Sequence, residues 1–194
     1  DMATVELIDS ATLGSDAATI TFSSIPTTYK DLWVWASVRT TKPFRYMTWL
    51  TCRINGSTTE SQYGWDSFSV ETAENSSSVN TQHSANYSSS SNSYTRLGRA
   101  GGSTHSKFGT DHFGGYYIVF YDYANTEIDR PISSHAGGSG VYGSPMPATA
   151  SMDWGQYYHN GSGTEITSLA FSDLVNEDDL AAGSKIDLYG VNAS

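Results

Sequence analysis

The sequence is poor in cysteine, in charge and in long apolar runs, and each scarcity excludes a class of protein. Cys52 is the single cysteine among 194 residues, so neither an internal disulfide framework nor a cysteine-based zinc cluster can form. Only 15% of the residues are charged, and no long stretch repeats apolar residues at helical spacing. No apolar run reaches the roughly 18 residues that a membrane-spanning helix needs, and no secretory leader is recognisable. The sequence therefore predicts neither a helical protein nor a membrane span.

Basic residues are scarce as well. Ten Lys and Arg stand against twenty Asp and Glu, which gives a formal net charge of −10. Nucleic acids and anionic membrane surfaces are bound through basic patches. We therefore expect neither nucleic acid nor a membrane as a partner.

The patterns that carry catalytic or metal chemistry are missing too. The five histidines include no His-x-His, His-x-x-x-His or HExxH spacing, so no local pair of metal ligands exists. A G-x-S-x-G nucleophile elbow is absent. Twenty acidic residues would allow a pair of glycosidase carboxylates by chance alone. We expect no enzyme, no catalytic residue, no cofactor and no metal.

What the sequence does contain is short runs of β-branched and aromatic residues, separated by Gly, Asn and Ser clusters. The most informative run is 31–40, in which alternate side chains point to opposite faces of a strand. One face is aliphatic and carries Leu32, Val34, Ala36 and Val38, while the other carries Trp33 and Trp35. Two large indoles favour a covered face, and the cover is either another part of this chain or another molecule.

Further strands are expected along the whole chain. Alternating or apolar runs predict them at 3–9, 18–22, 47–54, 62–70, 116–121, 128–135, 148–158, 164–171 and 184–191. Asn55-Gly56 predicts a tight turn, and the glycine-rich stretch 137–140 predicts a flexible link. About ten strands separated by turns indicate an all-β antiparallel sandwich of two sheets that occupies residues 1–194 as a single domain.

Residues 57–107 differ in texture, because Ser, Asn, Thr and Gly dominate them, above all between 71 and 93. Such runs bury too little apolar area to offset the entropy of ordering them. Two interpretations follow: a long polar surface insertion within the sandwich, or a loop that is ordered by packing on a neighbouring subunit.

Aromatic residues are the richest source of candidate sites, since the chain has thirteen Tyr and five Trp. Their rings fill sandwich cores, dominate protein interface hot spots, or stack against sugars. The candidates for an interface or a ligand site are Trp33, Trp35, Trp49, Tyr63, Trp65, Tyr121 and Tyr123.

Three stretches resemble virion proteins of tailed bacteriophages. Residues 10–39, SATLGSDAATITFSSIPTTYKDLWVWASVR, resemble an opening with the pattern ITFSSIP-x-TY-x-DL. Residues 164–191, TEITSLAFSDLVNEDDLAAGSKIDLYGV, resemble the closing pattern that ends in LYG followed by an aliphatic residue. Residues 108–123 resemble a strand of alternating aromatic and aliphatic residues. Residues 57–107 lie outside the resemblance.

The resemblance implies a jelly-roll-like structural protein of the phage particle, with no catalytic or cofactor residue to carry over. We expect a capsid decoration or cement protein on the head exterior that binds the major capsid protein, other virion proteins and its own copies. A trimer would suit a capsid lattice. The alternative is a receptor-binding or adhesion module of a tail or head fibre that recognises a host surface glycan. A polysaccharide depolymerase is a third possibility.

Overall fold

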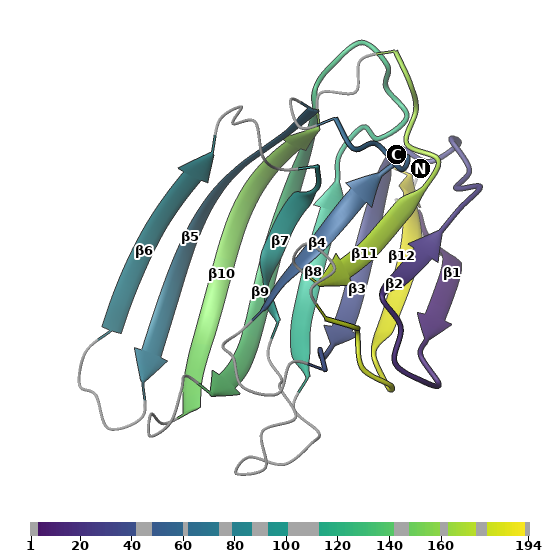
Figure 1. Ribbon diagram of the computed structural model, residues 1–194. Coiled ribbons are helices and arrows are strands. Elements are labelled where there is room, and N and C mark those ends of the chain that lie inside the picture. Colours follow the sequence, from purple (N-terminus) through teal and green to yellow (C-terminus); the bar gives the residue numbers. More distant parts are fainter. Residues whose placement is uncertain are drawn as a thin grey trace.

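The computed structural model describes residues 4–41, 48–59, 62–73, 79–86, 93–100, 113–141, 148–159, 163–173 and 178–192. Within these ranges the protein is all-β, with twelve strands in two antiparallel sheets and no α-helix (Figure 1). The prediction of an all-β sandwich is confirmed. The described residues contain twelve strands where about ten were predicted.

One sheet has eight strands and the other has four. The large sheet runs in the order β1 (Thr4–Thr12), β12 (Lys185–Asn192), β3 (Asp31–Val38), β8 (Gly114–Phe120), β9 (Arg130–Val141), β10 (Ala148–His159), β5 (Tyr63–Ala73) and β6 (Val79–Asn86). The small sheet runs β2 (Thr19–Phe22), β11 (Leu169–Asp173), β4 (Thr48–Ile54) and β7 (Thr95–Ala100).

The pairing has a nested order. β1 pairs with β12, β2 with β11, β3 with β8 and β4 with β7. Each pair thus encloses the next in the sequence, as in one long antiparallel hairpin. These pairs lie alternately in the large and the small sheet, so the hairpin folds over on itself into two layers. The strands β5 and β6 are inserted between β4 and β7, and β9 and β10 between β8 and β11. All four inserted strands extend the large sheet on the side away from β1 (Figure 1).

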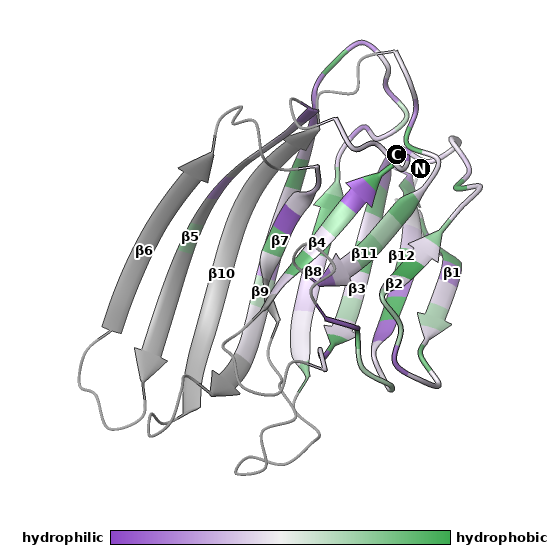
Figure 2. Cartoon of the chain, in the orientation of Figure 1, coloured by the Kyte–Doolittle hydropathy of each residue, from purple (hydrophilic) through white to green (hydrophobic). Residues whose placement is uncertain are grey.

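The core lies between the two sheets and follows the two-residue period of the strands. In β3, Leu32, Val34 and Val38 are fully buried, as the sequence predicted. From the small sheet, Phe22 and Phe171 meet edge to face with ring centroids 6.1 Å apart. Figure 2 shows apolar residues recurring along β11 and β12. Each fully buried side chain of this size contributes about 1.5–3 kcal/mol through removal of apolar surface from water.

Two loop predictions are wrong. The stretch 137–140 was expected to be a flexible link, but it lies inside β9, where Gly137 pairs with Gly115 of β8 and Met152 of β10. The stretch 71–93 was expected to belong to a polar surface insertion or to a loop ordered by a neighbouring subunit, with no strand in it. It does lie in an insertion between β4 and β7, but 71–73 and 79–86 form paired strands of the large sheet. In both cases backbone N–H and C=O groups pair with the adjacent strand, which requires no apolar side chain.

Parts of several predictions lie outside the described residues. These parts are residue 3 of the predicted strand 3–9, residue 47 of the predicted strand 47–54, and residues 60–61, 74–78, 87–92 and 101–107 of the polar insertion. They also include residues 108–112 and 174–177 of the stretches that resemble phage proteins.

The predicted turn at Asn55-Gly56 is confirmed. Asn55 has φ 50° and Gly56 has φ 65°, the left-handed region that a tight turn of this type needs. The backbone N–H of Ser57 donates to the carbonyl oxygen of Ile54 at 2.9 Å and closes the turn. The turn directs the chain from β4 in the small sheet towards β5 in the large one.

The Asn55 side chain also ties this turn to the segment that precedes β11. Its Oδ1 accepts hydrogen bonds from the backbone N–H groups of Thr167 at 2.8 Å and Ser168 at 3.0 Å. Its Nδ2 donates to the carbonyl oxygen of Glu165 at 2.6 Å. One amide therefore holds together two connections that are more than a hundred residues apart in the sequence.

We predict that Asn55→Ala lowers the free energy of unfolding by about 2 kcal/mol, because three hydrogen bonds are lost and alanine disfavours a positive φ. Urea denaturation followed by tryptophan fluorescence measures the change. Asn55→Gly is the matched control, since it tolerates the backbone angle but loses the same hydrogen bonds. If Asn55→Gly is as stable as the parent, the side-chain bonds contribute nothing.

Candidate functional site

The outer face of the large sheet, the face turned away from the small sheet, carries the two tryptophans of β3. Their position follows from the burial of Leu32 and Val34, because neighbouring side chains of a strand point to opposite faces. Trp33 is half-buried. Trp35 keeps 56% of its surface exposed, so the described part of the chain does not cover it.

Strand pairing adds further rings beside these tryptophans. Trp35 pairs with Tyr117 of β8, and Tyr117 pairs with His135 of β9, so the three side chains lie in line across the strands. Tyr117 meets Trp35 edge to face at 5.5 Å and 71°, and it meets Trp33 at 5.7 Å and 81°. The ring centroids of Tyr117 and His135 are 6.4 Å apart. We call Trp35, Tyr117 and His135 the aromatic row.

An open groove of about 430 Å³ runs beside the aromatic row. The row forms one wall, and Ser37 and Gly115, which pair with each other in the next register position, lie along it. Lys185 and Asp187 of β12 close one end. This outer-face groove lies within the size range of about 300–1,000 Å³ that is typical of small-molecule sites.

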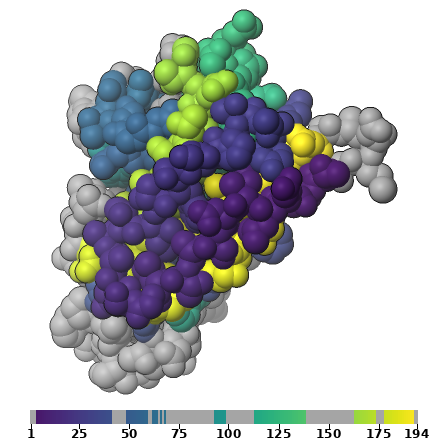
Figure 3. Space-filling model, turned by 90° about the vertical axis from the view of Figure 1, so that its right-hand side faces the viewer, coloured from purple at the N-terminus to yellow at the C-terminus, as the bar shows by residue number. Residues whose placement is uncertain are grey.

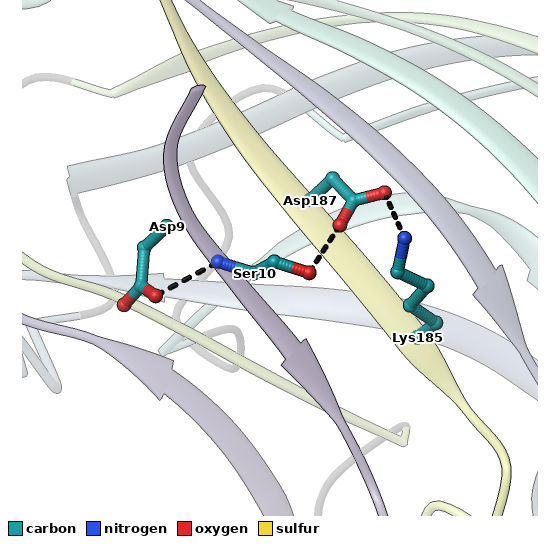
Figure 4. A network of polar contacts seen from close by, with 4 residues as sticks. All are labelled: Asp9, Ser10, Lys185 and Asp187. Atoms are coloured by element: carbon teal, nitrogen blue, oxygen red, sulfur yellow. Dashed lines mark hydrogen bonds and ion pairs between the residues drawn. The ribbon is translucent and has the colours of Figure 1, made fainter.

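The polar end of the groove is a hydrogen-bonded network (Figure 4). Lys185 Nζ lies 2.8 Å from Asp187 Oδ2, and Ser10 Oγ donates to Asp187 Oδ1 at 2.5 Å. The backbone N–H of Ser10 in turn donates to Asp9 Oδ1 at 2.8 Å. A shift of register in β1, between Leu7 and Asp9, brings Ser10 opposite Asp187. The network therefore fixes the end strand of the sheet to its neighbour.

The network holds Asp187 ionised. Partial burial raises the pKa of Asp187, but the hydrogen bonds from Lys185 and Ser10 and the charge of Lys185 outweigh it, so the pKa lies below its ordinary value. The hydrogen bond to Asp187 raises the pKa of Lys185 above its ordinary value. At neutral pH the groove thus ends in a carboxylate beside an ammonium group.

Two of the predicted site residues are core residues. Tyr63 is 2% exposed, and its hydroxyl donates to the carbonyl oxygen of Ser57 at 3.0 Å. Burial raises the pKa of Tyr63 to about 12. Tyr123 is fully buried, and its hydroxyl donates to the carbonyl oxygen of Pro26. As they lie in the fold, these two rings fill the sandwich and present no face to a ligand.

Of the other predicted residues, two lie apart from the groove, and the side chain of the third is not among those that the structure describes. Trp49 of β4 is half-buried, with the Arg96 guanidinium 5.5 Å from its ring centroid. Tyr121 is 40% exposed in the turn after β8, where its hydroxyl lies 3.1 Å from Ser133 Oγ. Trp65 lies in β5, and its side chain is outside what the structure describes.

Sequence reasoning singled out Trp35 but missed Tyr117, His135, Lys185 and Asp187. Local spacing contains no signal that brings these residues together, because β3 and β12 are far from each other and from β8 and β9 in the sequence. In the described ranges, no group of three or more His, Cys, Asp or Glu side chains is placed to hold a metal ion. The same ranges contain no helix that could cross a membrane.

Comparison of the chain with protein-family models, curated proteins and solved structures finds no match.

We predict that Asp187→Asn lowers the free energy of unfolding by about 1 kcal/mol at pH 7, a modest effect because Lys185 is half-exposed. The folded state lowers the pKa of Asp187. Asp187 therefore stabilises the fold fully above the pKa of an unfolded-state Asp, which is about 4, and this stabilisation disappears as the pH falls through the folded-state pKa. The free energies of unfolding of parent and variant, measured by denaturation at a series of pH values, should therefore become equal at acid pH.

The matched control is Glu127→Gln, which removes the same charge from an exposed residue in the turn before β9. A difference between Asp187→Asn and the parent that persists unchanged to low pH would contradict the assignment of an ionised Asp187.

Proposed function

We propose that this chain is a non-enzymatic structural protein of a tailed-phage virion, a capsid decoration or cement protein that binds the major capsid protein on the head exterior. The observation that carries this proposal concerns the stretches that resemble phage proteins. β2 and β3 lie in the opening stretch and β11 and β12 in the closing one, and they pair as β2–β11 and β3–β12. The resemblance therefore falls on one contiguous unit of the fold.

The nested strand order supports a jelly roll as the type of sandwich. A jelly roll is a two-sheet arrangement of eight strands, and the pairs β1–β12, β2–β11, β3–β8 and β4–β7 supply eight strands in two facing sets of four. Viral capsid and lectin domains are among the proteins built this way. The four inserted strands enlarge one sheet without changing this order.

We assign contact with the capsid to the end strand β1. Its Val5 and Leu7 are 53% and 52% exposed, although both are large apolar residues. Figure 3 shows this N-terminal segment, in purple, on the surface beside the yellow C-terminal strand. An end strand also presents unpaired backbone groups, to which a partner strand can add. Binding at many equivalent lattice positions would stabilise the assembled head by mass action.

We predict that quantitative mass spectrometry of intact virions finds this protein in a fixed, high ratio to the major capsid protein, because a decoration protein occupies lattice positions. Heads separated from tails should retain it. A few copies per particle that fractionate with the tail would contradict the decoration role and favour an appendage.

We predict that Leu7→Asp weakens binding of the purified protein to undecorated heads by at least about tenfold, since a charge would have to be desolvated at an apolar contact. Co-sedimentation with the heads measures binding. Light scattering of the free protein separately measures its oligomeric state, for which a trimer is expected. The matched control is Thr4→Asp, which places the same charge on the same exposed strand. Equal binding of the two variants would exclude the Val5–Leu7 face as the contact.

A further inference from the structure

We propose that the outer-face groove is a binding site for a neutral saccharide chain that lies across the strands of the large sheet. This inference goes beyond the proposed virion role and does not depend on it. The ligand class follows from three features of the groove: its aromatic wall, its floor at Gly115 and its polar end.

The aromatic wall runs perpendicular to the strands. Trp35, Tyr117 and His135 occupy successive register positions on β3, β8 and β9, and adjacent strands are about 4.8 Å apart. Through the backbone pairing with β10, the same register line reaches Phe68 of β5, whose side chain is 41% exposed. A wall of this kind offers one ring after another to an extended ligand.

At Gly115 the floor of the groove carries no side chain. A Cβ atom on Gly115 would meet only the carbonyl oxygen of Gly137, at 3.9 Å, which is an ordinary contact. The backbone of Gly115 also has no positive φ. Neither packing nor conformation therefore requires a glycine here, although glycine in a strand costs stability. An open floor beside the rings is what this residue provides.

The polar end supplies hydrogen-bonding groups. The Lys185 side chain is 50% exposed and the Asp187 side chain 17%, so an ammonium donor and a carboxylate acceptor lie at the mouth of the groove. His135 is exposed at the other side. Sugar hydroxyls need both donors and acceptors, whereas the C–H face of a sugar ring packs on the electron-rich face of an aromatic ring.

The charge of the protein distinguishes among the ligands that could occupy the groove. The chain carries a net charge of −10, so it repels polysaccharides that bear uronate, sulfate or phosphate groups. A neutral saccharide avoids this repulsion and uses both features of the groove. A purely apolar partner would leave the Lys185–Asp187 pair desolvated without compensation.

The test is titration of the purified protein with cellohexaose, mannohexaose and chitohexaose, with hexagalacturonate as the anionic probe. Saturation-transfer NMR detects contact, and tryptophan fluorescence gives the dissociation constant. We expect saturable binding of at least one neutral probe and none of hexagalacturonate. If no neutral probe binds at millimolar concentration, or if the anionic probe binds best, the proposal is overturned.

Two variants locate the site. Gly115→Val fills the floor while it keeps every ring and suits a strand, and Trp35→Ala removes the most exposed ring of the wall. Each should weaken binding by about tenfold or more. The matched control, Tyr121→Ala, removes a partly exposed ring outside the groove and should leave binding unchanged. Binding that survives both groove variants, or variants that instead change the oligomeric state, would show that the groove is not the saccharide site.

Discussion

The strict alternation of β3 is the constraint on which the rest of the structure depends. Leu32 and Val34 enter the core and are fully buried, so the intervening Trp33 is turned to the outer face and Trp35 with it. A slip of one residue would expose the aliphatic side chains and bury two indoles in their place. β3 also lies between β12 and β8, so its register sets which side chains of both neighbours reach the outer face.

This constraint explains why Trp35 could be read from the sequence whereas the other residues of the site could not. Trp35 follows from a local two-residue period, which is visible without any knowledge of the partner strands. Tyr117 and Lys185 belong to strands that are remote in the chain, and only the register of β8 and β12 on β3 brings them beside Trp35. Tyr63 and Tyr123 were misjudged for a related reason: abundance of aromatic residues does not distinguish a ring in the core from a ring on the surface.

The polar strands were misjudged because composition reports side chains, whereas a sheet is built from backbone groups. β6, which reads VNTQHSAN, contains little that is apolar, yet it pairs along its length with β5. A sheet that already exists provides donors and acceptors in the correct geometry, so an added strand needs less side-chain burial than an isolated one. The entropy argument that predicted a loop therefore applies to a segment alone and fails at the side of a preformed sheet.

The register shift between Leu7 and Asp9 also limits how the sheet can grow. On either side of the bulge a different set of β1 side chains faces outward, and such irregularities bend and twist a strand locally. A flat, uninterrupted border would invite copy after copy to line up without end, as in amyloid. A border broken in its middle leaves only short regular stretches for another strand to pair with, which disfavours unlimited strand-by-strand growth.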